Sequence, residues 1–297
     1  MKHELGFECI ISNLIKKINY TLTDFADYLS VSEKTVRNYI SKVSKPSLSV
    51  VNKIIDLLNV HNIDIYSLFD VEDDGYLFHG SKRGITGKIT TLNNVDSSND
   101  FGRGFYLSES FKNALTYVVN YDNSIIYRFN KTEFKNLSSY IFDKSDINDT
   151  IDWVIYIGFN RGKIISESDN NFFREYFDDR LGQYSLIIGE IADSYNFYVM
   201  DQFFDNQSDL KQVKVALTLA SLGNQYVLKD ETFANKLEVK DEYIIDKKLR
   251  DYLKQIKKET SYKLNTDSLN LRGNSKKDEK LLFDNLKKEL KDGFVKK

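Results

Sequence analysis

Apolar residues recur at helical spacing through the first seventy residues. Phe7, Ile10, Ile11, Leu14 and Ile18 stand three or four positions apart, which predicts an amphipathic helix. The same spacing predicts four more short helices, within residues 22–29, 33–40, 46–60 and 64–69. The pattern therefore predicts an all-α N-terminal domain, residues 1–70.

Residues that favour helix starts agree with this division. Thr21 and Ser32 precede two of the helices, and their hydroxyls can accept hydrogen bonds from the first free N–H groups. Pro46, the only proline, suits the first turn of the fourth helix. The stretch DVEDDG, residues 70–75, is acidic and lacks apolar periodicity, which predicts a linker.

After residue 75 the pattern changes to short runs of β-branched and aromatic residues. These runs predict strands at residues 76–80, 104–108, 124–129, 153–159, 184–191 and 224–229. Helical patterns lie between them, at residues 108–121 and 209–222. The irregular alternation favours an α+β fold over a doubly wound sheet.

The last sixty residues return to helical spacing. One apolar stripe comprises Ile244, Ile245, Leu249, Leu253 and Ile256, and another comprises Leu281, Leu282, Leu286 and Leu290. We therefore expect a charged helical tail, residues 239–297. Its helices either pack back on the core or form a surface for a partner such as an antitoxin or a nucleic acid.

Charge divides the chain more sharply than the net value of −2 indicates. Residues 1–70 hold eight basic and eight acidic residues, whereas residues 240–297 hold seventeen basic and eleven acidic ones. The middle is therefore acidic, which argues against non-specific binding of polyanions there. The three histidines are widely spaced and Cys9 is the only cysteine, so we expect no metal site and no disulfide framework. No apolar stretch approaches membrane-spanning length, and we expect a cytoplasmic protein without membrane contact.

The five N-terminal helices, with a tight turn between the second and third, resemble a helix-turn-helix domain of the phage-repressor type. In that family the third helix enters the major groove. The resemblance implies DNA contacts from Ser32, Glu33, Lys34, Thr35, Arg37 and Asn38. The alternative is a small bundle that binds a protein partner. The zero net charge of residues 1–70 favours that alternative, because DNA affinity depends on neutralising phosphates.

The stretches YLFHGS (residues 76–81) and DFGRGFYLSES (residues 100–110) together resemble ADP-ribosyltransferases of the His-Tyr-Glu type. They are most similar to a prokaryotic family with YHGS and DFGKGFYL motifs, often found beside helix-turn-helix or toxin–antitoxin elements. Residues 186–204 and 223–237 match later segments of that family. The resemblance covers residues 76–238 and implies a split pair of antiparallel sheets with helices.

The resemblance also implies that NAD is the substrate. His79 would bond the adenosine ribose, Gly80 would leave its backbone open to the nicotinamide amide, and Ser81 would bond a ribose or the amide. Tyr106 would stack on the nicotinamide, and we expect its side chain and that of His79 to face one cleft. Gly102 and Gly104 would permit the sharp entry into the strand, and Asp100 would brace the turn through its backbone.

The third catalytic position departs from the family pattern. A late strand usually supplies a glutamate, but the matching residue here is Gln225, which can form the hydrogen bond without bringing a charge. Glu190 is the second candidate and Glu231 the third.

Two functions remain open from the sequence. The first is an NAD-dependent ADP-ribosyltransferase, a toxin or defence effector that modifies a macromolecule and uses its helix-turn-helix for DNA or partner binding. The second is a DNA-binding regulator whose transferase-like domain binds a nucleotide without catalysis. Gln225 favours the second, and the complete His79 and Tyr106 motifs favour the first.

Overall fold

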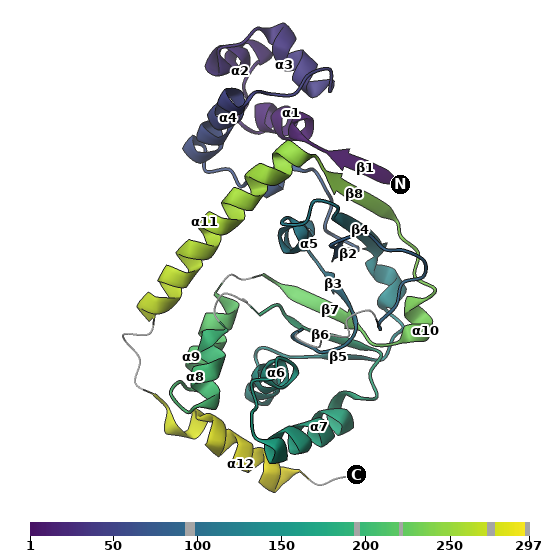
Figure 1. The fold of residues 1–297 in the computed structure, drawn as a ribbon, viewed down its shortest axis with the longest axis vertical. Helices are drawn as coiled ribbons and strands as arrows, with labels where there is room; N and C mark the ends of the chain where they lie inside the picture. Colours follow the sequence, from purple (N-terminus) through teal and green to yellow (C-terminus); the bar gives the residue numbers. More distant parts are fainter. Residues whose placement is uncertain (93–98, 193–196, 220–221, 272–276, 295–297) are drawn as a thin grey trace.

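The computed structural model describes residues 1–92, 99–192, 197–219, 222–271 and 277–294 of the 297-residue chain. A group of short N-terminal helices precedes a sheet flanked by helices, and two further helices end the described chain (Figure 1). The α+β class predicted from the sequence is confirmed.

The N-terminal helices agree closely with the hydrophobic pattern. They are α1 (Phe7–Lys17), α2 (Leu22–Leu29), α3 (Glu33–Ile40), α4 (Leu48–Val60) and the 3-10 helix η1 (Ile65–Leu68). Thr21 and Ser32 cap α2 and α3 by accepting hydrogen bonds from backbone N–H groups, as predicted. Pro46 lies outside the first turn of α4, because Ser47 is the cap of that helix.

Eight strands form one mixed sheet. They are β1 (Lys2–Leu5), β2 (Tyr76–Ser81), β3 (Phe105–Ser108), β4 (Ile125–Asn130), β5 (Ser139–Ile141), β6 (Leu186–Glu190), β7 (Asn224–Leu228) and β8 (Asp241–Ile245). Their order is β1-β8-β4-β2-β3-β7-β6-β5, with parallel pairs at both edges. The prediction of two separate antiparallel sheets is therefore corrected to one mixed sheet.

The middle of the sheet nevertheless has a weak join. Six residue pairs connect β2 with β4 and four connect β3 with β7, whereas the register between β2 and β3 is the single pair Phe78 and Ser108. The two halves of the sheet therefore diverge beside Phe78, and the strands of His79 and Tyr106 border that divergence.

Helices cover one face of both halves. On the half that holds β2, α5 (Phe111–Val118) packs against Phe78 and joins a core shared with the N-terminal helices. On the other half, α6 (Ile147–Asn160) forms the centre of a second cluster, here called the α6 cluster. This cluster includes Phe101, Trp153, Ile157, Phe173, Ile187, Met200, Phe203, Val227 and Phe283. The opposite face carries a third cluster, the outer cluster, which includes Leu77, Phe105, Leu107, Tyr127, Phe129, Leu186, Ile188, Tyr226 and Leu228.

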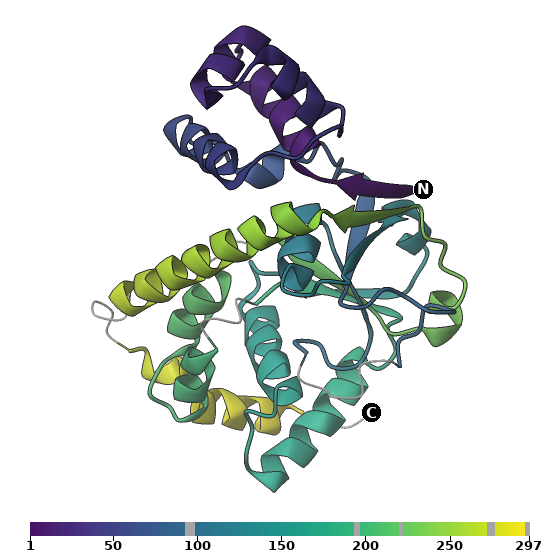
Figure 2. The ribbon, with the colours of Figure 1, turned by 45° about the horizontal axis from the view of Figure 1, so that its top comes forward.

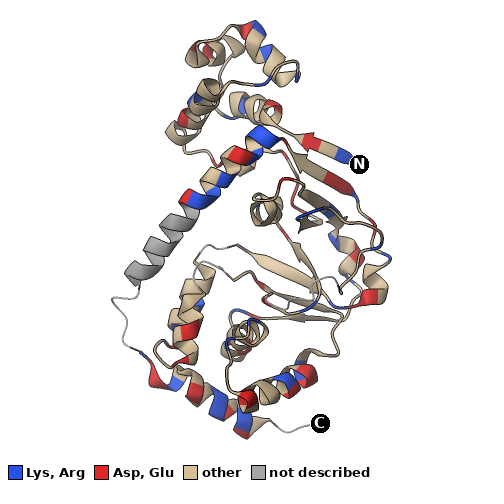
Figure 3. Ribbon diagram, in the orientation of Figure 1, with Lys and Arg blue, Asp and Glu red and all other residues tan. Residues whose placement is uncertain are grey.

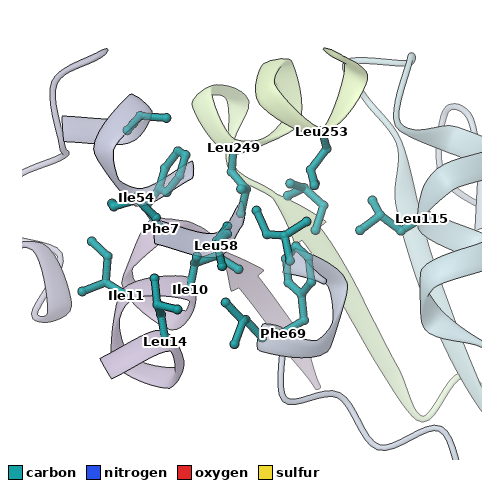
Figure 4. Close-up of a cluster of buried hydrophobic side chains, with 14 of the residues drawn as sticks. Phe7, Ile10, Ile11, Leu14, Ile54, Leu58, Phe69, Leu115, Leu249 and Leu253 are labelled. Atoms are coloured by element: carbon teal, nitrogen blue, oxygen red, sulfur yellow. The ribbon is translucent and has the colours of Figure 1, made fainter. Parts of the chain in front are cut away.

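The shared core fixes the helix-turn-helix helices to the sheet. Figure 4 shows side chains of α1 and α4 meeting those of α5 and α11 (Lys247–Leu271). The labelled residues are Phe7, Ile10, Ile11, Leu14, Ile54, Leu58, Phe69, Leu115, Leu249 and Leu253. Strand β1 also pairs with β8 at the edge of the sheet. The N-terminal helices therefore share one hydrophobic core with the rest of the chain.

Three segments differ from the sequence prediction. Lys2–Leu5, within the domain predicted as all-α, form β1 at the edge of the sheet. Residues 153–159, predicted as a strand, lie in α6, because a continuous apolar run fits a buried helix as well as a buried strand. Asp146 caps this helix by accepting from the N–H groups of Asn148 and Asp149. Ile244 and Ile245, assigned to a helical stripe, belong to β8, and the helix begins after Asp246.

Further helices complete the layer on the α6 side of the sheet (Figure 2). They are α7 (Glu167–Leu181), α8 (Tyr198–Phe204), α9 (Leu210–Thr218), the 3-10 helix η5 (Glu279–Leu281) and α12 (Phe283–Gly293). The short helices η2 (Lys131–Phe134) and α10 (Glu231–Ala234) pack against the outer cluster through Phe134 and Ala234. Phe283 and Leu286 of α12 are buried in the α6 cluster, and Leu249 and Leu253 of α11 in the shared core. Both tail helices thus pack back on the core, and Figure 3 shows acidic and basic residues along the described parts of both. Among the described residues, no helix is long and apolar enough to span a bilayer.

Candidate active site

The turn at residues 100–104 leads into β3 and is closed by the side chain of Tyr106. The Tyr106 hydroxyl donates to the Gly102 carbonyl at 2.7 Å and accepts from the Phe101 N–H at 3.0 Å. Burial raises the pKa of this hydroxyl well above its usual value, so it stays protonated and keeps donating. Gly102 has a left-handed φ of +68°, and a Cβ there would lie 2.5 Å from Asn160 Oδ1. Glycine is therefore required on conformational and steric grounds.

Side chains from other elements hold the same turn. Lys229 donates through Nζ to the carbonyls of Phe101 and Arg103, the second at 2.6 Å. Burial lowers the pKa of Lys229 to about 8. Asn160, at the end of α6, donates through Nδ2 to the Asp100 carbonyl at 3.3 Å. Residues 100–104 of the motif thus form a turn whose backbone carbonyls are bound from several sides.

The carboxylate of Asp100 is buried between two other side chains. Its Oδ1 accepts from Nε and Nη2 of Arg161, at 3.1 and 2.6 Å. Its Oδ2 accepts from Nε2 of Gln225 at 3.0 Å, and the same amide nitrogen is 3.3 Å from the Glu190 carbonyl oxygen. Asp100 therefore connects the turn to α6 and β7, which corrects the prediction that it acts through its own backbone.

His79 lies at the divergence of β2 from β3. Its Nδ1 is 2.7 Å from the Tyr106 carbonyl oxygen, so Nδ1 carries the proton and donates. Its ring stacks on Phe105, with ring centroids 4.2 Å apart. Burial lowers the pKa of His79 to about 4, and the imidazole is therefore neutral near pH 7. Its remaining nitrogen, Nε2, is then a hydrogen-bond acceptor, and no described residue bonds it.

The side chains of His79 and Tyr106 do not face one side of the sheet. Tyr106 packs against the α6 cluster, whereas the His79 ring contacts Phe105 and Tyr127 of the outer cluster. Phe78 pairs with Ser108, so Tyr106, two residues from Ser108, shares the face of Phe78. His79 follows Phe78 in β2 and therefore points to the opposite face. The expectation of one cleft faced by both side chains is therefore wrong. The two residues meet through the imidazole of His79 and the carbonyl of Tyr106.

The two predicted glycine contacts are explained by packing. A Cβ on Gly80 would lie 2.5 Å from the Ala114 carbonyl oxygen of α5, and one on Gly104 would lie 2.5 Å from Cγ1 of Val227. Both glycines thus allow close approach of neighbouring elements, and a role in ligand binding stays a prediction. Ser81 is the last residue of β2 and is partly exposed.

The two glutamate candidates have different surroundings. Glu190 ends β6 beside Gln225, and its carboxylate is 3.5 Å from Nζ of Lys144. Glu231 accepts hydrogen bonds from the backbone and hydroxyl of Thr91 and from the hydroxyl of Thr90. These bonds, led by those of Thr91, lower the pKa of Glu231 to about 2. Glu231 therefore fastens the segment before residue 92, whereas Glu190 lies next to the Asp100–Gln225 contact.

The predicted DNA-contacting residues lie at the start of α3. Ser32 is occupied as the cap, its hydroxyl accepting from the Thr35 N–H at 3.1 Å. Glu33 and Arg37 form an ion pair one turn apart, at 3.2 Å. The side chains of Lys34 and Arg37 are exposed, and Asn38 is partly exposed. Lys34 and Arg37 are therefore the residues of this group available to neutralise phosphates.

Two surface cavities lie away from this site. Their volumes are about 450 and 480 Å³, and both are lined by Tyr176, Arg180 and Leu290. None of the predicted catalytic residues lines either cavity. Asp152, beside the first cavity, has its pKa raised to about 6 by burial. These cavities are therefore not part of the candidate site that contains His79 and Gln225.

Comparison with known proteins identifies two regions. The family model described as "Protein of unknown function (DUF3990)" matches residues 76–239, more than half of the chain. The chain belongs to the DUF3990 family. A helix-turn-helix family model matches residues 11–61, which confirms the resemblance of the N-terminal helices. No curated protein and no solved structure matches the chain.

The DUF3990 region contains every element of the candidate site. Strands β2, β3, β6 and β7 and helix α6 all fall within residues 76–239. Strand β1 and helices α11 and α12 lie outside both matched regions. The shared core holds residues of both matched regions, and α11, which lies outside both, adds Leu249 and Leu253 to it.

Sequence reasoning missed three residues of the site in this DUF3990 chain. Asn160, Arg161 and Lys229 all hold the turn or its aspartate. Asn160 and Arg161 follow a run predicted as a strand, so no helix end was expected there. The cap at Asp146 was the signal that could have indicated a helix here, and a helix of ordinary length begun there can reach residue 160.

Proposed function

We propose that this DUF3990 chain is an ADP-ribosyltransferase that uses NAD as its substrate and binds DNA through its helix-turn-helix region. The observation that supports this best is a pair of neutral hydrogen-bond acceptors on either side of β3. One is Nε2 of His79, whose Nδ1 is committed to Tyr106. The other is Oε1 of Gln225, whose Nε2 is committed to Asp100 and Glu190.

Two uncharged acceptors suit hydroxyl donors such as those of ribose. β2 and β7 flank β3, so two strand spacings of about 4.8 Å place these residues on the order of 10 Å apart. His79 lies on the face of the outer cluster, whereas Gln225 shares the α6 face with Val227. A dinucleotide carries two riboses, and it would bring one to each acceptor only by passing through the divergence of β2 from β3. His79 would bond a hydroxyl of the adenosine ribose, as the family resemblance implies, and Gln225 one of the nicotinamide ribose.

The reaction requires positive charge to be stabilised at the nicotinamide ribose. The bond from nicotinamide nitrogen to ribose breaks, and both electrons leave with nicotinamide. A nucleophile of the acceptor macromolecule bonds to the same ribose carbon and loses its proton to solvent. An amide oxygen fixed near the ribose favours the cationic transition state over the ground state. The acceptor macromolecule is a protein or a nucleic acid in this proposal.

The helix-turn-helix region would bring the enzyme to DNA. Lys34 and Arg37 are exposed on α3, the helix that enters the major groove in this type of domain. Because the region shares a core with the sheet, bound DNA and the candidate site would keep a fixed relation. A toxin or defence role, with a cognate antitoxin, agrees with this arrangement.

A second candidate function is a DNA-binding regulator whose DUF3990 region binds a nucleotide without cleaving it. The observation that favours it is Gln225 itself. Its amide carries no charge and its nitrogen is already bonded within the protein. Such a site would hold a ribose without driving cleavage.

Incubation of the full chain with adenylate-labelled NAD and cell lysate separates these functions. His79→Asn keeps a nitrogen that can donate to the Tyr106 carbonyl but removes the Nε2 acceptor. His61→Asn, on an exposed histidine that follows α4, is the matched control. We expect label on a macromolecule with the wild type and His61→Asn, and little with His79→Asn.

Other outcomes decide against the transferase. NAD binding measured by calorimetry, without release of nicotinamide or transfer of label, would favour the regulator. A wild-type chain that neither binds nor cleaves NAD would overturn the transferase and would leave the regulator only with a nucleotide other than NAD.

A further inference from the structure

The amide of Gln225 has one orientation that its surroundings permit. Its nitrogen lies 3.0 Å from Asp100 Oδ2 and 3.3 Å from the Glu190 carbonyl oxygen. Both neighbours are acceptors, so the amide nitrogen must face them and Oε1 must point elsewhere. Gln225 is 6% exposed, and no described residue donates to Oε1. The free atom of this buried amide is therefore an oxygen.

Asp100 is itself held in place. Arg161 binds Oδ1 through two nitrogens, which leaves Oδ2 for Gln225. The guanidinium of Arg161 also lies over the ring of Phe197, 4.3 Å from its centroid. A carboxylate fixed by a two-point contact cannot rotate freely, so it also fixes the amide bonded to it.

We infer that Asp100 is a positioning residue that turns the oxygen of the Gln225 amide toward the reacting ribose. The inference rests on the proposed function and goes beyond it by assigning the carboxylate of the site. The negative charge of the site is carried by Asp100, which is hydrogen-bonded to the nitrogen of the Gln225 amide. The atom that contacts the ribose is the oxygen of that amide. A glutamate at position 225 would place two carboxylates within hydrogen-bond distance, a contact that like charges disfavour.

The experiment exchanges the amide and the carboxylate between the two positions. Asp100→Asn, Gln225→Glu and the double variant are compared with the wild type in kcat and KM for NAD cleavage and in melting temperature. Each single change should lower kcat by roughly tenfold to a hundredfold, the range found when a group that orients a functional ligand is lost. KM should change little, because the interaction strengthens in the transition state.

The double variant is the decisive sample. It restores one amide facing one carboxylate, so kcat should recover well above the product of the two single fold-changes, and melting temperature should fall by less than the sum of the two single changes. Asp169→Asn is the matched control. Asp169 is also buried and ion-paired, to Lys287 and Lys291, and its loss should lower melting temperature without changing kcat.

Failure of the inference differs from failure of the proposed function. Independent effects of the two substitutions in an active enzyme, or an Asp100→Asn variant with wild-type kcat, would overturn the positioning role. Absence of NAD cleavage in the wild type would overturn the proposed function. The coupling in melting temperature would then still report whether Asp100 orients the Gln225 amide.

Discussion

Helix α3 and the turn of residues 100–104 carry the residues singled out for binding and for chemistry, and they are supported in opposite ways. On α3, the hydroxyl of Ser32 and the ion pair of Glu33 with Arg37 act within the helix, and the charged ends face solvent. In the turn, backbone carbonyls and the Asp100 carboxylate are bound by side chains of α6 and β3 and by Lys229 and Gln225.

The difference predicts what mutations will do in each region. An exposed residue of α3 has few partners, so its loss should change binding and leave stability nearly unaltered. A residue of the turn has buried polar partners, so its loss leaves them without hydrogen bonds and costs stability before any chemistry is measured. Activity measurements in the turn therefore need a stability measurement beside them.

The largest expected effect tests whether the helix-turn-helix region unfolds together with the sheet or separately from it. Leu253 of α11 is fully buried in the shared core. Leu253→Ala should lower the free energy of unfolding by about 2–5 kcal/mol. Unfolding followed by helical circular dichroism and by fluorescence of Trp153, the only tryptophan, should shift by the same amount.

Trp153 lies in the α6 cluster, so separate transitions for the two probes would contradict a single cooperative unit. Lys258→Ala, on an exposed position of the same helix, is the control and should change stability by less than about 0.5 kcal/mol.

The second largest effect on stability is expected at Gly102, where the side chain of Asn160 leaves no room for a Cβ. Gly102→Ala introduces a side chain at φ +68° and within 2.5 Å of Asn160 Oδ1, and should cost about 2–4 kcal/mol. Gly75→Ala is the matched control, because Gly75 has φ +77° and nothing within 4 Å of its Cβ position. The control should cost only the backbone strain, about 1 kcal/mol. Equal losses of stability in chemical denaturation would show that Asn160 does not restrict the turn.

The same contrast explains how far the sequence could predict each region. Helix α3 follows from local information: apolar spacing at Val36 and Tyr39 and a serine cap. Its boundaries were accordingly predicted. Of the residues expected to be exposed, Ser32, Lys34 and Arg37 are exposed and the others are partly exposed. The strands that carry His79, Tyr106 and Gln225 were also predicted, because β-branched and aromatic runs mark them.

The contacts of the turn could not be predicted, because they join residues far apart in the chain. Asp100 meets Arg161 and Gln225, 61 and 125 positions away. No spacing rule connects such positions. The orientation of His79 also depends on the divergence of β2 from β3, a property of the assembled sheet. Local patterns thus identified the residues, and only the fold identified their partners.

The third effect is the response of His79 to pH. Its pKa is lowered from 6.5 to about 4 in the folded chain, so the unfolded chain binds the proton more tightly. Stability should therefore fall as pH decreases from about 6.5 toward 4, with a loss of about 2 kcal/mol between pH 7 and pH 5. His79→Asn cannot titrate and should lack this loss. Denaturation of both proteins at the two pH values measures the difference, and parallel curves would show that His79 is protonated equally in both states.

The smallest expected effect on stability is that of substitutions on α3. Lys34→Ala and Arg37→Ala should each change the free energy of unfolding by less than about 0.5 kcal/mol, because both side chains are exposed. Each should nevertheless weaken DNA binding, since each removes a charge that neutralises a phosphate. The slope of log affinity against log salt should fall in magnitude by about 1 for each lost contact.

Lys16→Ala, on the exposed last turn of α1, is the control for general loss of positive charge and should leave the slope unchanged. Fluorescence anisotropy of labelled duplex DNA over a range of salt concentrations gives these slopes. Identical slopes for all three variants and the wild type would remove α3 from the DNA contact and leave the helix-turn-helix region as a surface for a protein partner.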